Sequence, residues 1–128
     1  MPPLNEPVAP PFKSRPGLRR VWQALRYSRD GLVAAFRHEA AFRQELAAGL
    51  PLAMLAWWIA PGRWEALAMT LAIVTVFAVE LLNLAVEALA DAVSPEAHPL
   101  IKRAKDMGSA AVMLSIAGAA AVWVVALL

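Results

Sequence analysis

The sequence predicts an all-α membrane protein built from one amphipathic surface helix and three transmembrane helices. Hydrophobic residues make up 60% of its 128 residues, above the roughly 45–50% that is typical of soluble domains. A soluble chain of this length has too little interior to cover so much apolar surface. The apolar residues also form long runs with basic residues beside them, as in membrane proteins. The length allows a single domain.

The basic residues are unevenly placed. Of the 12 lysines and arginines, eight lie between Lys13 and Arg43, three lie between Lys102 and Lys105, and Arg63 stands apart. Because each basic patch borders an apolar run, anionic lipid and the positive-inside rule explain the patches better than nucleic acid, which we do not expect as a partner. The chain has no cysteine, which excludes disulfides and thiolate metal sites.

The N-terminal part predicts a tail followed by a surface helix. Residues 1–16 are rich in proline and predict a disordered tail, without the apolar core and cleavage site of a signal peptide. Over residues 17–38, apolar side chains recur on one helical face, which is typical of a helix lying in the membrane surface. Asp30 and Gly31 favour a bend, so one helix and two short helices are both open.

Three apolar runs follow, over residues 40–60, 64–92 and 104–128. Each approaches or exceeds the roughly 20 residues that a transmembrane helix needs. Pro51 predicts a kink in the first run, and Pro61 with Gly62 predicts a turn after it. Residues 17–128 are therefore expected to form one membrane domain.

The basic patches and the tryptophans predict the same orientation. The positive-inside rule places the N-terminus and residues 102–105 in the cytoplasm, and the C-terminus outside. Tryptophans gather at membrane interfaces, and here they flank the predicted outer turn. Trp123 lies about 24 Å along its helix from Met107, near the same outer surface.

The second predicted span carries polar residues that recur on one stripe: Glu80, Asn83, Glu87 and Asp91. A charge at mid-membrane costs at least about 2.5–3.5 kcal/mol, so such residues usually face a protein interior and have a function. At the same depth, Glu39 and Glu45 open the first span, and Lys105 and Asp106 open the third. Carboxylates near a lysine suit a divalent cation, a phosphate and a general base.

The alternative interpretation is that these residues are helix-end charges, contacts between helices or snorkelling side chains, and Asp91 and Glu45 fit it best. It explains any one residue better than it explains the whole cluster. The sequence has neither a P-loop nor a protein-kinase glycine loop.

Three segments resemble the bacterial diacylglycerol kinase family. Residues 39–45 (EAAFRQE) are similar to its first-helix segment, and the residues from Glu80 to Asp91 match its E-x-x-N-x-x-x-E-x-x-x-D pattern. Residues 103–112 (RAKDMGSAAV) are similar to the start of its third helix. The resemblance covers the chain from about Arg20 to the C-terminus and leaves out the proline-rich tail.

The resemblance implies an enzyme of the bacterial inner membrane, a homotrimer that transfers a phosphoryl group from MgATP to the hydroxyl of diacylglycerol. Glu80 is similar to the catalytic base, with Asn83 beside it, and Glu39 and Glu87 are similar to the ligands of Mg²⁺. The implied nucleotide-binding residues are Arg20, Tyr27, Glu39, Glu87, Glu96, His98, Lys105 and Asp106. The implied lipid-binding residues are Arg20, Ser28, Phe36, Ala41, Phe42, Arg43, Gln44, Glu45, Glu80, Ser109 and Trp123.

The chain departs from the family pattern at Phe36, where a tryptophan is common, and at Ala97 and Pro99 near the implied nucleotide site. Two alternative functions stay open at this point. One is a kinase of undecaprenol, because relatives of this architecture accept polyprenols. The other is a non-enzymatic oligomer whose buried carboxylates relay protons or ions, although it leaves Lys105, Asp106 and the surface helix without a purpose.

Overall fold

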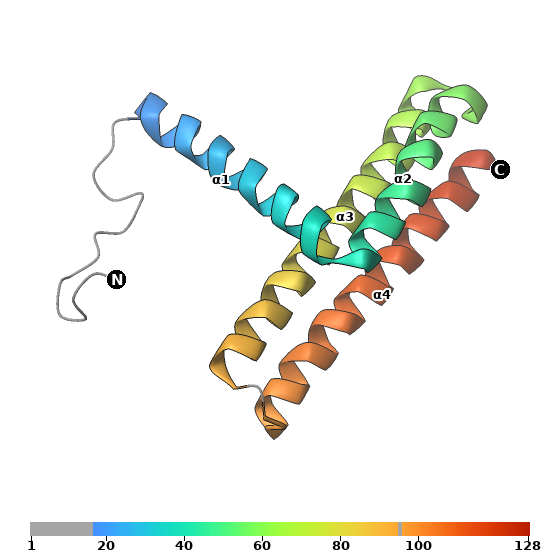
Figure 1. The fold of residues 1–128 in the computed structure, drawn as a ribbon. Helices are drawn as coiled ribbons and strands as arrows, with labels where there is room; N and C mark the ends of the chain where they lie inside the picture. Colours follow the sequence, from blue (N-terminus) through green and yellow to red (C-terminus); the bar gives the residue numbers. More distant parts are fainter. Residues whose placement is uncertain (1–16, 95) are drawn as a thin grey trace. The chain divides into compact units, whose positions relative to one another are not determined.

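The computed structural model describes residues 17–94 and 96–128, and the predicted tail of residues 1–16 lies outside them. Four helices make up the fold: α1 (Gly17–His38), α2 (Ala40–Ile59), α3 (Arg63–Val93) and α4 (Pro99–Leu127) (Figure 1). Every regular element in the described part of the chain is an α-helix, which confirms the predicted all-α class. The last helix begins at Pro99, before the expected start near residue 104.

The described residues divide into two units, residues 17–34 and Ala35–Leu128. In the first unit, residues 17–34 belong to α1, which is one continuous helix without a break at Asp30 or Gly31. Its apolar residues lie mainly on one face, because Leu18, Val21, Trp22 and Leu25 follow the spacing of a helical stripe.

In the second unit, α3 is the central helix and packs against both α2 and α4. The α2–α3 turn and the C-terminus lie at one end of this unit, and the α3–α4 connection lies at the other (Figure 1). At 1.5 Å per residue, the 20 residues of α2 span about 30 Å and the 31 residues of α3 about 46 Å. Hence α2 cannot cover the whole length of α3.

Two glycines mark close approaches of α3 to its neighbours. A Cβ atom at Gly49 of α2 would overlap the ring of Phe77, and one at Gly108 of α4 would overlap Oδ1 of Asn83. Small residues at such positions let membrane helices pack closely. At Gly118 of α4, a Cβ atom would meet nothing within 4 Å in this chain.

Replacing Gly49 by alanine is therefore expected to lower the stability of the α2–α3 pair. The added methyl group overlaps Phe77 and also comes within 3.3 Å of Ile73, and overpacking of this kind typically costs about 1–3 kcal/mol. Gly118→Ala is the matched control, because it brings the helix propensity of alanine without a clash in this chain. Thermal unfolding in detergent measures both. A Gly49→Ala variant as stable as Gly118→Ala would contradict the close packing.

Two of the described helices, α3 and α4, are long and apolar enough to cross a membrane. The first turns of α2 carry Arg43, Gln44 and Glu45, and α2 does not meet the same criterion. No residue of α4 is buried within the chain. Large apolar side chains on α4, among them Leu100, Met113, Leu114, Val124 and Val125, are more than half exposed. A soluble monomer rarely exposes so much apolar surface, which indicates a membrane protein.

Candidate active site

The site begins with two polar side chains inside the α2–α4 unit. Glu80 is 5% exposed and Asn83 is 9% exposed, and they are the only polar side chains classed as buried in the described part of the chain. Both lie on α3, as does the half-buried Glu87 one turn further on. The more exposed Asp91 completes the stripe, about 16 Å along the axis from Glu80. Burial thus decreases along the stripe towards the α3–α4 connection.

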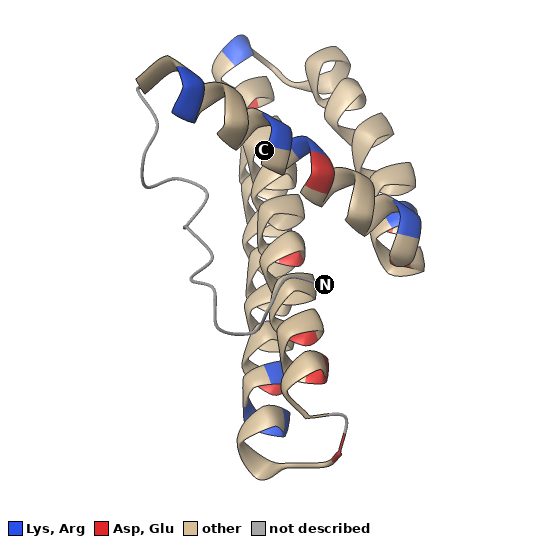
Figure 2. Cartoon of the chain, turned by 60° about the vertical axis from the view of Figure 1, so that its left-hand side comes forward, with Lys and Arg blue, Asp and Glu red and all other residues tan. Residues whose placement is uncertain are grey.

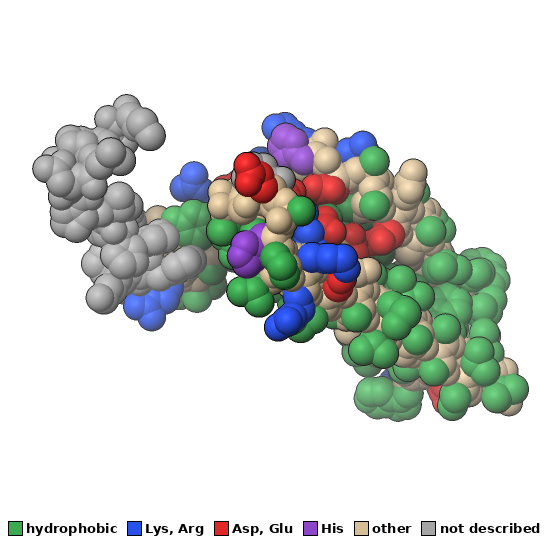
Figure 3. Space-filling view, turned by 90° about the horizontal axis from the view of Figure 1, so that it is seen from below, with side chains coloured by type: hydrophobic (Ala, Val, Ile, Leu, Met, Phe, Trp, Pro, Cys, Tyr) green, Lys and Arg blue, Asp and Glu red, His purple; other side chains and the backbone are tan. Residues whose placement is uncertain are grey.

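Other carboxylates lie close enough to Glu80 to act on it electrostatically. They belong to Glu45 and Glu39 at the start of α2 and to Glu87 on α3. Glu39 is the N-cap residue of α2, yet its side chain makes no capping hydrogen bond. Acidic residues recur along the helices of this unit (Figure 2). When the molecule is viewed from the end that carries the α3–α4 connection, acidic and basic side chains lie close to one another on the surface (Figure 3). The structure therefore brings α2 and α3 together around Glu80.

Two buried oxygens in this region have no hydrogen-bond partner among the described residues: Oε2 of Glu45 and Oδ1 of Asn83. A buried acceptor without a donor typically costs about 1–3 kcal/mol, so native proteins rarely keep one without a reason. These atoms are suited to accept hydrogen bonds from a ligand, from water or from another chain.

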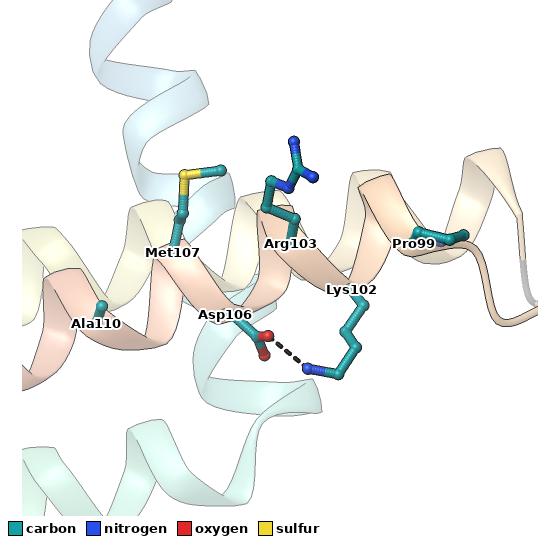
Figure 4. Close-up of a pocket in the computed structure, with 6 residues that line it drawn as sticks. All are labelled: Pro99, Lys102, Arg103, Asp106, Met107 and Ala110. Atoms are coloured by element: carbon teal, nitrogen blue, oxygen red, sulfur yellow. Dashed lines mark hydrogen bonds and ion pairs between the residues drawn. The ribbon is translucent and has the colours of Figure 1, made fainter.

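The start of α4 adds two ion pairs. Lys105 donates from Nζ to Oδ1 of Asp91 on α3, at 2.6 Å. Lys102 pairs with Asp106 one turn along α4, also at 2.6 Å. Lys102 and Asp106 also line a shallow cavity of about 420 Å³. Their side chains point to one side of α4, and those of Arg103 and Met107, which line it too, point to the other (Figure 4). Lys105 and Asp106, both predicted to bind nucleotide, are thus each paired with a residue outside the predicted nucleotide-binding set.

Several predicted site residues make contacts that hold the fold. His98 caps α4, because its Nδ1 accepts a hydrogen bond from the backbone N–H of Leu100 at 3.1 Å. Arg43 donates to the backbone carbonyls of Phe36 and Arg37, at 2.7 and 3.2 Å, and so ties the end of α1 to the start of α2.

Trp123 and Phe42, both predicted to bind lipid, also take part in packing. Trp123 donates from Nε1 to the carbonyl of Met69 at 3.0 Å, which joins α4 to α3. Phe42 is 1% exposed, so its ring is covered by protein in this chain.

The remaining predicted residues divide by unit. Arg20, Tyr27 and Ser28 lie on α1, where a small cavity of about 140 Å³ is lined by Gln23, Arg26, Tyr27 and Asp30. In the second unit, five further predicted residues are exposed: Phe36, Ala41, Gln44, Glu96 and Ser109.

The described residues contain no group of three His, Asp or Glu side chains placed to hold a metal by themselves. Carboxylate oxygens are nonetheless the ligands that Mg²⁺ prefers, and Mg²⁺ is usually bound by one or two carboxylates together with substrate phosphates and water. The carboxylates of Glu39 and Glu87, both near Glu80, fit such an arrangement in type and number.

Comparison with known proteins identifies the family. A model of prokaryotic diacylglycerol kinases matches residues 26–127. A diacylglycerol kinase of Pseudomonas aeruginosa is 44% identical to the chain over 92% of the chain and 96% of the relative. Similar proteins of the same name from Escherichia coli K12 and Haemophilus influenzae are 41% and 37% identical, over 87% and 84% of the chain and 91% of each relative. The chain belongs to the prokaryotic diacylglycerol kinase family.

Proposed function

We infer that the chain is a membrane-bound diacylglycerol kinase, which transfers the γ-phosphoryl group of ATP to the hydroxyl of diacylglycerol and gives phosphatidic acid and ADP. The observation that carries this inference is a buried carboxylate, Glu80, on a membrane-span helix, close to other carboxylates. Family membership supports the reaction that we assign to this carboxylate, because the three relatives compared are named diacylglycerol kinases.

In the proposed reaction, Glu80 takes the proton of the lipid hydroxyl while the hydroxyl oxygen attacks the γ-phosphorus. The bond from that phosphorus to the β–γ bridging oxygen breaks in line, and the electron pair leaves with ADP. Asn83, one turn from Glu80, offers its unpartnered Oδ1 for orienting polar groups at the site. Lys105 and Asp106 contact the nucleotide, and the ammonium of Lys105 balances phosphate charge.

We assign Glu39 and Glu87 as the protein ligands of Mg²⁺. When bound with ATP, the ion neutralises charge on the phosphates and helps to orient them. We assign proton transfer to Glu80 and not metal binding, because its carboxylate is the most buried of the three.

The alternatives differ in substrate. Purified protein in mixed micelles should form phosphatidic acid from diacylglycerol at a higher kcat/KM than it forms undecaprenyl phosphate from undecaprenol. The two lipids should be assayed side by side with MgATP. A preference for undecaprenol would make the chain a polyprenol kinase, and no lipid product with either would favour the ion-relay alternative.

We propose that α2 crosses the membrane together with α3 and α4, that α1 lies on the cytoplasmic surface, and that the membrane is the bacterial inner membrane. The exposed apolar side chains of the second unit and the basic residues near its cytoplasmic end support this arrangement. The N-terminus is then inside and the C-terminus outside.

The orientation can be tested directly because the natural sequence has no cysteine. Single cysteines placed at Gly62 or Leu128 are expected to react with an impermeant thiol reagent added to intact cells, and one at Ala97 is expected to react only after the cells are opened. Labelling of Ala97→Cys in intact cells would reverse the proposed orientation.

We propose further that the enzyme is a homotrimer with active sites shared between chains. The support is that α4 has no buried residue in one chain, although we assign Lys105 and Asp106 at its start to the nucleotide. Sharing predicts that inactive Glu80→Gln and Asp106→Asn chains complement each other. Random mixing leaves both residues intact at about one half times one half of the sites, so roughly a quarter of the activity should return. A mixture that stays inactive after confirmed subunit exchange would place both residues in one chain.

A further inference from the structure

The ion pair between Asp91 and Lys105 is the contact that the proposed reaction leaves unexplained. It joins the last turn of α3 to the second turn of α4, and its two side chains are 65% and 40% exposed. Lys105 is the residue assigned to phosphate, whereas Asp91 has no role in the proposed reaction. The contact is direct, with Nζ of Lys105 lying 2.6 Å from Oδ1 of Asp91, and unlike the neighbouring Lys102–Asp106 pair it joins two helices.

We propose that Asp91 is a positioning residue, which holds the ammonium of Lys105 in place to receive the nucleotide phosphates. The proposal rests on the proposed kinase function and adds a residue to the nucleotide site. A lysine ammonium has three N–H donors, so Lys105 keeps donors for phosphate oxygens while one N–H is bound to Asp91. A free lysine side chain loses considerable rotamer freedom when it is ordered by a ligand. The contact with Asp91 restricts the Lys105 side chain before ATP binds, so less rotamer freedom is lost on binding.

A purely structural role explains the pair less well. An exposed ion pair adds little to stability, and α3 and α4 already pack along their length, with Trp123 bound to Met69 and Asn83 against Gly108. The pair also differs from the neighbouring Lys102–Asp106 pair, which lies within one helix at i,i+4 spacing and does not connect α4 to α3.

The negative charge of Asp91 also repels phosphate, so the direction in which ATP affinity changes when Asp91 is replaced tells repulsion from positioning. If charge repulsion dominated, removing Asp91 would strengthen ATP binding. If positioning dominates, removing it weakens binding. The proposal commits to the second outcome, because the carboxylate is exposed to water and its repulsion is screened, whereas its contact with Lys105 is direct.

The test uses the full-length protein and two readouts, the KM for ATP with diacylglycerol and the Kd for MgATP without lipid. Asp91→Asn keeps the shape and removes the charge, and it is expected to raise both constants by about two- to fivefold, the range for an exposed ion pair. kcat is expected to change less than KM. Asp91→Glu, which restores the carboxylate, should recover part of the affinity. The matched control Glu65→Gln removes a carboxylate from the opposite end of α3 and should leave both constants unchanged.

A double-mutant cycle separates positioning from a general structural effect. In a Lys105→Gln background, Asp91→Asn is expected to have no further effect on the Kd for MgATP, because the group that it positions is gone. An equal rise in both backgrounds would overturn the proposal, as would an unchanged or lower Kd in the single variant. If the wild type binds MgATP but does not phosphorylate diacylglycerol, the proposed function fails while the Kd comparison still decides the role of Asp91.

Discussion

Replacing Glu80 by glutamine is expected to lower turnover by about 10²–10⁴-fold, which is the usual contribution of a general base. Glutamine has nearly the same shape as glutamate but cannot accept the hydroxyl proton. The affinity for MgATP should change little, because the metal and phosphate contacts belong to other residues. Steady-state kinetics with diacylglycerol and a separate measurement of MgATP binding check the two parts of this prediction.

The same substitution is expected to leave the protein at least as stable as the wild type. Glu80 is 5% exposed and lies near three other carboxylates, so losing its charge removes both a desolvation cost and a repulsion. Lost activity with an equal or higher unfolding temperature therefore indicates a catalytic role and not misfolding. Near-normal turnover in Glu80→Gln would mean that another group takes the proton.

Replacing Glu39 or Glu87 by glutamine is expected to weaken magnesium binding and not proton transfer. Each change removes a charged oxygen ligand from the metal, and we expect the magnesium concentration for half-maximal activity to rise at least about tenfold, since even residues behind the ligands contribute about 10–100-fold to metal affinity. High magnesium should restore part of the activity of both variants. It should not restore Glu80→Gln, whose defect lies in the proton transfer. Wild-type magnesium dependence in both variants would place the metal elsewhere.

Much of this architecture could be predicted from the sequence because the responsible signals are local. Apolar runs and the Pro61–Gly62 turn separate α2 from α3, whereas α4 begins five residues before the expected start near residue 104. The stripe of Glu80, Asn83 and Glu87 follows from helical spacing alone. Glu80 and Asn83 are buried and Glu87 is half-buried, in agreement with the physical expectation that polar groups in a span face protein.

The contacts between helices could not be predicted in the same way. Lys102 and Asp106 are four residues apart on one helix, a spacing at which side chains can pair. The contact of Lys105 with Asp91 depends instead on how α3 and α4 pack. The same holds for Gly49 against Phe77 and for Trp123 against the carbonyl of Met69. Spacing places a residue on a face of its own helix, and only the packed structure shows which residue of the neighbouring helix it meets.

The central claim, direct phosphoryl transfer from ATP to a lipid with Glu80 as the base, is tested most directly by following the γ-phosphorus. Purified protein in micelles with diacylglycerol should be given ATP labelled in the γ-phosphate, beside a Glu80→Gln sample. The expected result is label in phosphatidic acid, equal in amount to the ADP formed, with none retained on the protein and almost none in the variant's lipid. Label that passes through the protein, or ATP consumption without labelled lipid, would contradict direct transfer.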